Sequence, residues 1–370
     1  MRLGVEAALV DGRLVPGDVA IDGSLVQAVG LDGDGRGVAV PGFVDLQVNG
    51  FAGVDFLGAD ADGFATAGEA LLETGVTAYL PTLITSEERD LVAALASIPQ
   101  HAAGPRILGV HLEGPFLSPA RLGTHRLAAR RDPDPALLER LLAAGPVRLV
   151  TLAPELPGAL DLVDLLHARG VVVSLGHTNA TASEAHAAFD RGVRAVTHVF
   201  NAMRPLAHRD PGVVGAALIR PDVVLQAIVD GVHLAPDIVR LLWRVGAGRL
   251  SLVTDAIAGA GLGDGTYALG EIEIVVADDV VRSGDGVLAG SALTMIEAVR
   301  NLVAVDVPLE RALEAATSIP ARVLGERALG RLAPGARADI VVLDAPSAIH
   351  LAYRPGVPLV QMVLLNGELT

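Results

Sequence analysis

Residues 109–119 read GVHLEGPFLSP: an apolar strand runs into Glu113 and then breaks at once at Gly114 and Pro115. Strands that are apolar on both faces are typical of parallel sheets, because helices cover both faces of such a sheet. We therefore expect eight parallel strands, with Glu113 at the end of the third. The seven other runs of this kind, which also end in polar residues or turn signals, are residues 42–48, 76–82, 147–153, 171–177, 193–199, 223–230 and 249–255.

Stretches with helical periodicity separate these runs. Residues 160–170, 181–192 and 235–246 carry apolar residues at helical spacing, and several such stretches open with Thr or Pro and close with Gly, as capped helices do. Eight strand–helix units in succession predict an α/β fold, the (β/α)8 TIM barrel. In this architecture the carboxyl ends of the strands and the loops after them form the active site, which explains a carboxylate at the end of a buried strand.

The two ends of the chain differ from its middle. Residues 1–40 and 335–370 hold short strands broken by Asp-Gly, Asn-Gly and Pro-Gly, the turn dipeptides of hairpins. We expect the two termini to meet in one small β-sandwich domain outside the barrel. The predicted organisation is therefore a β domain built from residues 1–40 and 335–370, and a barrel domain over residues 41–334.

The composition limits the partners and the location of the chain. The formal net charge of −15 argues against nucleic acid or an anionic membrane as a partner. Every long apolar stretch is interrupted well before the roughly 18 residues that indicate a membrane span. Glu6 and Asp11 interrupt the region where a signal peptide would be apolar, so we expect a soluble, cytoplasmic protein. Because the chain has no Cys, any metal must be held by His and carboxylates.

Four polar side chains stand at the predicted strand ends. Glu113 ends the third strand and His177 the fifth, while His198 and Asp255 end the sixth and the eighth. Taken singly, each could be a solvated cap, but independent caps have no reason to share the rim of one barrel. A Glu with two neutral imidazoles suits Zn²⁺ or Fe²⁺, and a carboxylate outside this set could move protons. The sequence therefore predicts a metal centre beside an acid–base carboxylate.

The motifs that carry this chemistry also carry a resemblance. Taken together, eight motifs of this chain resemble those of the N-acetylglucosamine-6-phosphate deacetylase family of the amidohydrolase superfamily. The resemblance covers essentially the whole chain, including the split β domain. HLEGPF, FNAM and DGVH are its most specific parts, whereas PGFVD occurs across the superfamily. In chain order the motifs are PGFVDLQVNG (41–50), HLEGPF (111–116), GTH (123–125), GHTNA (176–180), THVFNAM (197–203), DGVH (230–233), LVTDA (252–256) and LAGSALTMIEAVRN (288–301).

The resemblance implies a reaction and a role for each matching residue. The expected reaction is hydrolysis of N-acetyl-D-glucosamine 6-phosphate to D-glucosamine 6-phosphate and acetate, in amino-sugar catabolism and cell-wall sugar recycling. Glu113, His177 and His198 would hold the metal. Asp255 would act as general base and then as general acid, and His125 would contact the acetamido carbonyl. Family members are typically homodimers. The residues expected to bind substrate are Thr124, His125, Asn201, Ala202, Arg209, Asp230, Gly231, Val232, His233, Leu288, Ala289 and Gly290.

Elementary chemistry agrees with this assignment. A bound divalent metal lowers the pKa of water to about 7, and Asp255 could accept that water's proton. The proton must then reach the departing amine, because an amide anion is a very poor leaving group. The metal and His125 could together stabilise the developing oxyanion. Arg209 offers a planar fork and His233 a further donor, which are the local groups that a phosphate requires in an acidic protein.

One departure from the superfamily pattern concerns the first strand. Many amidohydrolases carry His-x-His there for a second metal, whereas this chain has Gln47 and Asn49. Amides are weak ligands for zinc, so we expect one divalent ion per chain and ordinary hydrogen bonding for the two amides. Zn²⁺ is the expected ion, and Fe²⁺, Mn²⁺ and Co²⁺ also accept two His and a Glu.

Two other functions stay open. A dihydroorotase-like or dipeptidase-like amidohydrolase usually has His-x-His and often a bridging carboxylated Lys, and no Lys stands at a predicted strand end. A non-catalytic barrel would be expected to have lost Asp255 or a metal ligand, and none is missing. His111 is expected to support Glu113 rather than bind metal, and His208 could touch phosphate. The histidines expected to be structural or solvent-facing are His101, His167, His186 and His350.

Overall fold

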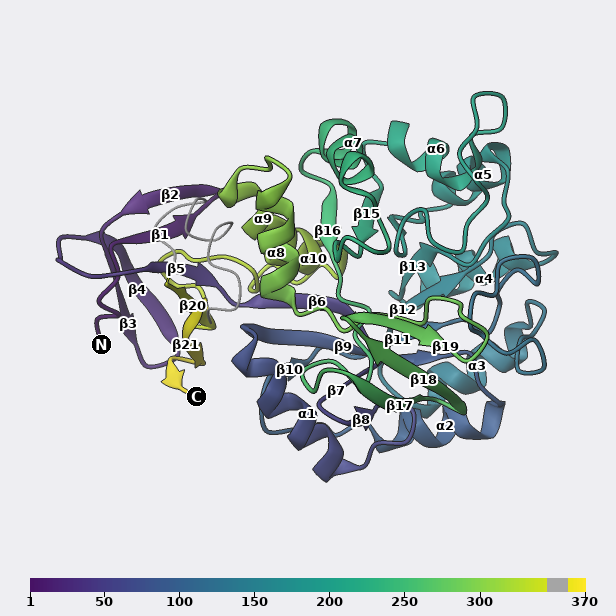
Figure 1. Ribbon diagram of the computed structural model, residues 1–370, viewed down its shortest axis with the longest axis horizontal. Coiled ribbons are helices and arrows are strands. Elements are labelled where there is room, and N and C mark those ends of the chain that lie inside the picture. Colours follow the sequence, from purple (N-terminus) through teal and green to yellow (C-terminus); the bar gives the residue numbers. More distant parts are fainter. Residues whose placement is uncertain (345–358) are drawn as a thin grey trace.

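The computed structural model describes residues 1–344 and 359–370, so His350 lies outside the described residues. Eight parallel strands follow one another around a barrel in sequence order (Figure 1). Seven of the eight predicted runs contain one of these strands and the eighth, 76–82, covers all but the last two residues of β9, which confirms the predicted fold. The barrel strands are β6 (Phe43–Val48), β9 (Val76–Ile84), β11 (Val110–Glu113), β12 (Val147–Leu152), β13 (Val172–Leu175), β14 (Ala195–Val196), β15 (Val224–Ala227) and β16 (Leu250–Leu252), and the short β10 (Arg106–Ile107) pairs with β9.

Backbone hydrogen bonds just beyond the last strand close the barrel. The N–H of Asp255 donates to the carbonyl of Gln47 at 2.9 Å, and the N–H of Asn49 donates to the carbonyl of Ala256 at 2.7 Å. Gln47 and Asp255 are 208 positions apart in the sequence. Closure therefore places the carboxyl ends of the first and last strands next to each other.

Helices follow the barrel strands, as the alternating pattern predicts. α5 and α8 begin with complete capping boxes, formed by Thr181 with Glu184 and by Thr294 with Glu297. The longest described helix has 13 residues, and no described helix has the length and apolar character that a bilayer crossing requires. The helices are α1 (Ala61–Glu73), α2 (Glu88–Ser97), α3 (Pro135–Ala144), α4 (Ala159–Ala168), α5 (Ala182–Asp190), α6 (Gly212–Ile219), α7 (Pro236–Gly246), α8 (Met295–Ala304), α9 (Leu309–Ala316) and α10 (Ser318–Val323).

Strands from both termini form a separate β unit, which Figure 1 shows to one side of the barrel. The two chain ends meet where β5 pairs antiparallel with β20, and a hairpin of β3 and β4 shares a buried apolar core with this sheet. β5 leads almost directly into barrel strand β6. The strands are β1 (Ala7–Val10), β2 (Arg13–Pro16), β3 (Asp18–Asp22), β4 (Leu25–Leu31), β5 (Val38–Pro41), β20 (Ile340–Leu343), β21 (Val360–Leu365) and β22 (Glu368–Leu369).

An antiparallel sheet of three strands, absent from the predicted plan, lies between β16 and α8. It consists of β17 (Gly265–Leu269), β18 (Ile272–Ala277) and β19 (Val280–Ser283). Asp278 and Asp279 join the last two strands with φ values of 51° and 61°, and two consecutive positive φ values are typical of a tight hairpin turn. A smaller hairpin, β7 (Gly50–Phe51) with β8 (Val54–Asp55), follows β6.

Candidate active site

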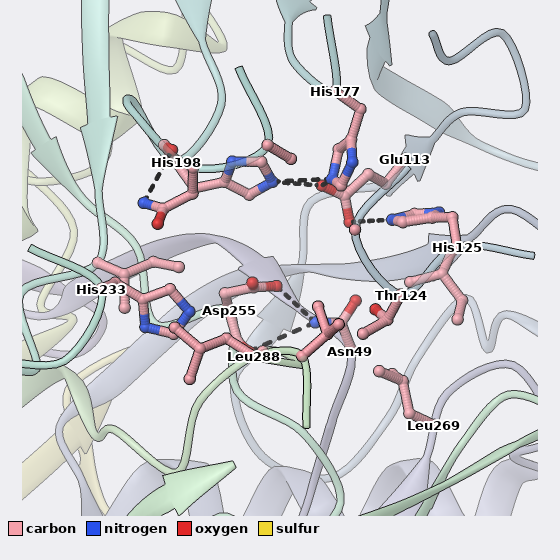
Figure 2. Close-up of a pocket in the computed structure, with 17 residues that line it drawn as sticks. Asn49, Glu113, Thr124, His125, His177, His198, His233, Asp255, Leu269 and Leu288 are labelled. Carbon is pink, nitrogen blue, oxygen red and sulfur yellow. Dashed lines mark hydrogen bonds and ion pairs between the residues drawn. The ribbon is translucent and has the colours of Figure 1, made fainter. Parts of the chain in front are cut away.

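A pocket of about 370 Å³ opens at the carboxyl ends of the barrel strands (Figure 2). Polar side chains from several strands face apolar ones from the loops and from β17. This is the mixture of a mostly apolar wall and a few placed polar groups that small-molecule sites share. The lining residues are Asn49, Ile84, Glu113, Gly123, Thr124, His125, His177, His198, Asn201, Ala202, Ile228, His233, Asp255, Leu269, Val287, Leu288 and Gly290.

Three buried ligand atoms form a small triangle in this pocket. Glu113 Oε1 lies 3.1 Å from His177 Nε2 and 2.9 Å from His198 Nε2, and the two imidazole nitrogens are 3.1 Å apart. Each residue is at most 5% exposed. One carboxylate oxygen and two imidazole nitrogens at such separations are a donor set that fits a single divalent cation.

The hydrogen bonds of His177 indicate which of its nitrogens is free to bind. His177 Nδ1 lies 3.0 Å from the carbonyl oxygen of Arg121, which can only accept, so Nδ1 carries the proton. Burial lowers the pKa of His177 to about 4, which keeps the ring neutral. The lone pair on Nε2 therefore faces an oxygen of Glu113. A cation between these two atoms would relieve their repulsion, so the residues present fit a bound metal.

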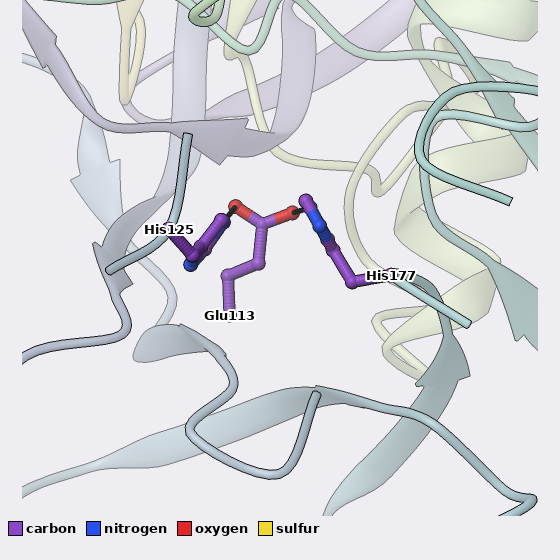
Figure 3. Close-up of side chains that lie close together, drawn as sticks. All are labelled: Glu113, His125 and His177. Carbon is purple, nitrogen blue, oxygen red and sulfur yellow. Dashed lines mark hydrogen bonds and ion pairs between the residues drawn. The ribbon is translucent and has the colours of Figure 1, made fainter. Parts of the chain in front are cut away.

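His125 lies on the other side of the same carboxylate (Figure 3), and its ligand atom belongs to a second group that could hold a metal, with Glu113 and His177. Its Nε2 is 3.6 Å from Glu113 Oε2. The backbone N–H of Thr85 donates to His125 Nδ1 at 3.3 Å, which leaves the proton of the neutral ring on Nε2. An Nε2–H group donates hydrogen bonds and does not ligate metal. The tautomer therefore favours the set with His198 over the set with His125.

The carboxylate of Asp255 lies across the pocket and contacts two amides. Its Oδ1 accepts hydrogen bonds from Gln47 Nε2 at 3.0 Å and from Asn49 Nδ2 at 2.6 Å. Burial and the nearby carboxylate of Glu113 raise the pKa of Asp255 to about 6. A carboxyl group whose pKa lies near neutrality can both accept and release a proton, as acid–base catalysis requires.

His233 stands at another edge of the pocket and is held by Asp230. His233 Nδ1 lies 2.6 Å from Asp230 Oδ2, and the backbone N–H groups of Val232 and His233 both donate to Asp230 Oδ1 at 2.8 Å. Burial raises the pKa of Asp230, but these hydrogen bonds lower it by more. The pKa of Asp230 therefore lies below its usual value. Asp230 thus holds the His233 ring in place at the edge of the pocket.

The backbone turns sharply at three of the site residues. His177, His198 and Asp255 have φ values of 46°, 29° and 52°. This left-handed region costs roughly 1 kcal/mol or more for residues other than glycine. Such conformations persist where the surrounding structure holds them, and they gather at functional sites.

Most of the predicted site residues line the pocket, and five do not. Arg209 is exposed on the loop before α6 and is not among the lining residues, and the same holds for its neighbour His208, which stood outside the predicted set. Asp230 bonds to the His233 ring without lining the pocket, Gly231 and Val232 are exposed, and Ala289 is buried in the core beside the pocket. Both ring nitrogens of His111 bond to threonines, Thr82 at 3.2 Å and Thr151 at 2.8 Å, and not to Glu113, which His111 was expected to support. Among the other histidines, His101 and His167 are exposed and His186 is half-buried.

Six lining residues were not among the predicted site residues. Asn49 was expected only to form ordinary hydrogen bonds at the barrel mouth. Gly123 and Val287 are direct neighbours of predicted residues in the GTH and LAGS stretches, so the motifs could have included them. Ile84 and Ile228 end or follow barrel strands, and their position on the rim was the available signal. Leu269 comes from β17, which no motif marks.

Fold and site together define a (β/α)8 barrel with a buried Glu-His-His group that could bind a metal, and the comparisons with known proteins agree. Residues 38–370 match the amidohydrolase family, and the chain belongs to this family. It is 41% identical over 343 residues to the N-acetylglucosamine-6-phosphate deacetylase of Homo sapiens, covering 87% of this chain and 83% of that one. It is also 37% identical over 337 residues to an N-acetylgalactosamine-6-phosphate deacetylase of Escherichia coli O157:H7, covering 89% and 86%.

A solved structure of the same kind is similar over the full length. The N-acetyl-D-glucosamine-6-phosphate deacetylase of Mycobacterium smegmatis, solved as a mutant in complex with N-acetyl-D-glucosamine-6-phosphate, matches with a TM-score of 0.92 and 39% identity. The match covers 100% of this chain and 98% of that one. The split β unit and the barrel thus have counterparts together in one known structure.

Proposed function

We propose that this chain is a metal-dependent deacetylase that converts N-acetyl-D-glucosamine 6-phosphate and water to D-glucosamine 6-phosphate and acetate. The observation that carries the proposal is the triangle of Glu113, His177 and His198 in one pocket with the Asp255 carboxylate. Relatives that are 39 and 41% identical over most of the chain bear the name of this activity, and one was solved with this substrate.

Glu113, His177 and His198 would hold the metal, for which zinc is our proposal. A divalent cation bound by them lowers the pKa of water toward neutrality and polarises an amide carbonyl. Because Gln47 and Asn49 place amide nitrogens and not imidazoles toward Asp255, we propose one cation per chain.

Asp255 would move the proton that the reaction requires. As a water oxygen attacks the carbonyl carbon of the acetamido group, the free Oδ2 of Asp255 accepts the proton of that water. The same oxygen then gives the proton to the nitrogen while the C–N bond breaks, so that the amine leaves neutral. Acetate and the free amino sugar result, with no other reactant.

His125 would stabilise the carbonyl oxygen as it becomes negative. Its Nε2–H is a donor because Thr85 occupies Nδ1, and it faces the carboxylate of Glu113 at the centre of the site. Removing one donor of this kind typically costs about 3 kcal/mol of barrier. Thr124, Asn201, Ala202, Leu288 and Gly290 line the pocket and would contact the sugar.

His233 and Arg209 would bind the phosphate. Asp230 holds the His233 ring at the edge of the pocket, whereas Arg209 would have to reach the phosphate from an exposed loop. Arg209→Ala is expected to raise KM for the 6-phosphate roughly 10- to 100-fold, the range of a lost charged hydrogen bond, and to leave an unphosphorylated analogue unaffected. Steady-state kinetics on both compounds measures this. An equal loss on both would remove Arg209 from the phosphate site.

A substrate panel tests the proposed function itself. Purified protein is assayed for acetate release from the 6-phosphates of N-acetylglucosamine, N-acetylgalactosamine and N-acetylmannosamine, and from the unphosphorylated sugars. We expect the highest kcat/KM on N-acetylglucosamine 6-phosphate and its loss after chelation, with recovery on adding Zn²⁺. No acetate from any member of the panel in metal-loaded protein would refute the proposal.

Two further expectations belong to this proposal. A homodimer, expected from the family resemblance, predicts twice the chain mass in sedimentation equilibrium. A cytoplasmic location predicts that the activity is recovered with cytoplasmic markers on cell fractionation.

A further inference from the structure

A single amide links the two carboxylates of the site. Gln47 lies on β6 and is fully buried, and its Nε2 is 3.2 Å from Glu113 Oε1 and 3.0 Å from Asp255 Oδ1. Asn49, two residues on and therefore on the same face of the chain, places its Nδ2 2.6 Å from the same oxygen of Asp255. Figure 2 shows Asn49 and Asp255 joined in this way.

The orientation of both amides follows from the charges they face. With the nitrogens turned toward the carboxylates, Gln47 Oε1 and Asn49 Oδ1 are buried and have no hydrogen-bond partner among the described residues. Turning either amide over would place its oxygen against a carboxylate oxygen, which is repulsive. Leaving two buried carbonyl oxygens unpaired lowers stability. An arrangement retained at this cost indicates a function for the two N–H groups.

The two amides also distinguish the oxygens of Asp255. Both side-chain N–H groups are directed at Oδ1, and no hydrogen bond from the described residues is directed at Oδ2. Oδ1 is therefore the anchored oxygen, and Oδ2 is the one free to accept and release a proton. A residue that anchors one oxygen of a base restricts the rotation of the other, which is how hydrogen bonds orient catalytic groups.

We propose that Gln47 and Asn49 are positioning residues for the proposed deacetylation: they anchor Asp255 through Oδ1, and Gln47 ties this anchored base to the ligand Glu113. Their N–H groups act through Asp255 and touch neither substrate nor metal. This inference rests on the proposed function, since it assigns the residues a part in that same reaction.

Gln47→Met is the test variant, because methionine keeps the length and flexibility of the side chain and removes the N–H. The matched control is Gln226→Met, since Gln226 is also fully buried on a barrel strand, its side-chain amide has no hydrogen-bond partner among the described residues, and it is not one of the residues that line the active-site pocket. For Gln47→Met we expect kcat to fall roughly 10- to 100-fold, the usual effect of losing a supporting hydrogen bond at a metal site. KM and metal content, measured by mass spectrometry, should stay within about twofold of wild type, and Gln226→Met should match wild type in all three.

Each other outcome overturns the inference. Loss of metal in Gln47→Met would make Gln47 a metal ligand, a raised KM with normal kcat would make it a substrate contact, and unchanged kinetics would make it structural. If Gln47→Met does not fold, Asn49→Ala removes the hydrogen bonds from Asn49 Nδ2 to Oδ1 and to the backbone oxygen of Asp255, at 2.6 and 3.5 Å, and has the same expected pattern.

A crystal structure of the metal-free Gln47→Met protein gives a readout that needs no activity. The Asp255 side chain should leave the position it has here, and a side chain that stays in place would refute the anchoring. If the wild-type protein releases no acetate, the proposed function fails, and this structure still tests whether the amides hold Asp255.

Discussion

Replacing Asp255 by asparagine separates chemistry from folding at the centre of the site. The side chain of Asp255 is buried, and its Oδ1 accepts hydrogen bonds from Gln47 and Asn49. Asparagine keeps the size of the side chain and one acceptor oxygen. It can therefore retain both hydrogen bonds at Oδ1 and loses only the basic oxygen that would move the proton.

These contacts set the expected changes in reaction rate and in stability. A positioned acid–base group contributes about two to four orders of magnitude in rate, so the barrier should rise by roughly 2.7 to 5.5 kcal/mol. Leucine at the same position would instead leave two buried N–H groups without an acceptor, each costing about 1 to 3 kcal/mol of stability. Asp255→Asn should therefore remain folded, whereas Asp255→Leu should lower the unfolding midpoint.

The assay is acetate release by purified Asp255→Asn, with metal content and thermal unfolding measured on the same sample. We expect a wild-type midpoint, about one metal per chain, an unchanged affinity for substrate and a kcat lower by roughly 10²- to 10⁴-fold. A folded, metal-loaded variant within about tenfold of wild-type turnover would remove Asp255 from the mechanism. His125 would then be the next base to test.

Three further predictions concern the surrounding residues. Wild-type protein should retain about one equivalent of metal per chain, and His177→Ala should lose most of it. Two tightly held equivalents in wild type would contradict a single metal site. His125→Gln, whose amide N–H can replace Nε2–H, should keep more turnover than His125→Asn, and both should keep the metal; metal loss in both would make His125 a ligand. Burial raises the pKa of Asp45 to about 7, although Thr254 donates to it at 2.6 Å, so the folded protein holds this proton more tightly than the unfolded chain, where the pKa is near 3.8. The stability that this proton contributes is complete below pH 3.8 and is lost as the pH rises to about 7. The unfolding midpoint of Asp45→Asn should therefore rise relative to that of wild type between pH 5 and pH 8. A difference between the two midpoints that stays constant over this range would contradict the raised pKa of Asp45.

The barrel and most of its site could be predicted from local patterns. Apolar runs and helical spacing are properties of neighbouring residues, and they placed all eight strands. A barrel of parallel strands brings its strand ends to one rim whatever the loops contain, so Glu113, His177, His198 and Asp255 were expected in one pocket and line it.

The three-stranded sheet before α8 shows where local patterns were read incompletely. Its alternating burial and the Asp278–Asp279 turn are signals of a hairpin. Neither signal belongs to a motif that was used to predict the barrel. The sheet nevertheless contributes Leu269 to the pocket, so part of the pocket wall was missed with it.

The sequence by itself determined that the side chains at the ends of the barrel strands meet, and only the tertiary structure decided how they are paired. Thr85 sets the tautomer of His125 from 40 positions away, and Gln47 reaches Asp255 across 208 positions after the barrel has closed. Such contacts depend on strand register, rotamers and loop paths. No short stretch encodes them, because a hydrogen bond forms only when two distant segments lie within about 3 Å of each other. The same reason explains why the sequence could not show whether Arg209 lies in the pocket: its charge suits a phosphate, but its loop leaves it exposed.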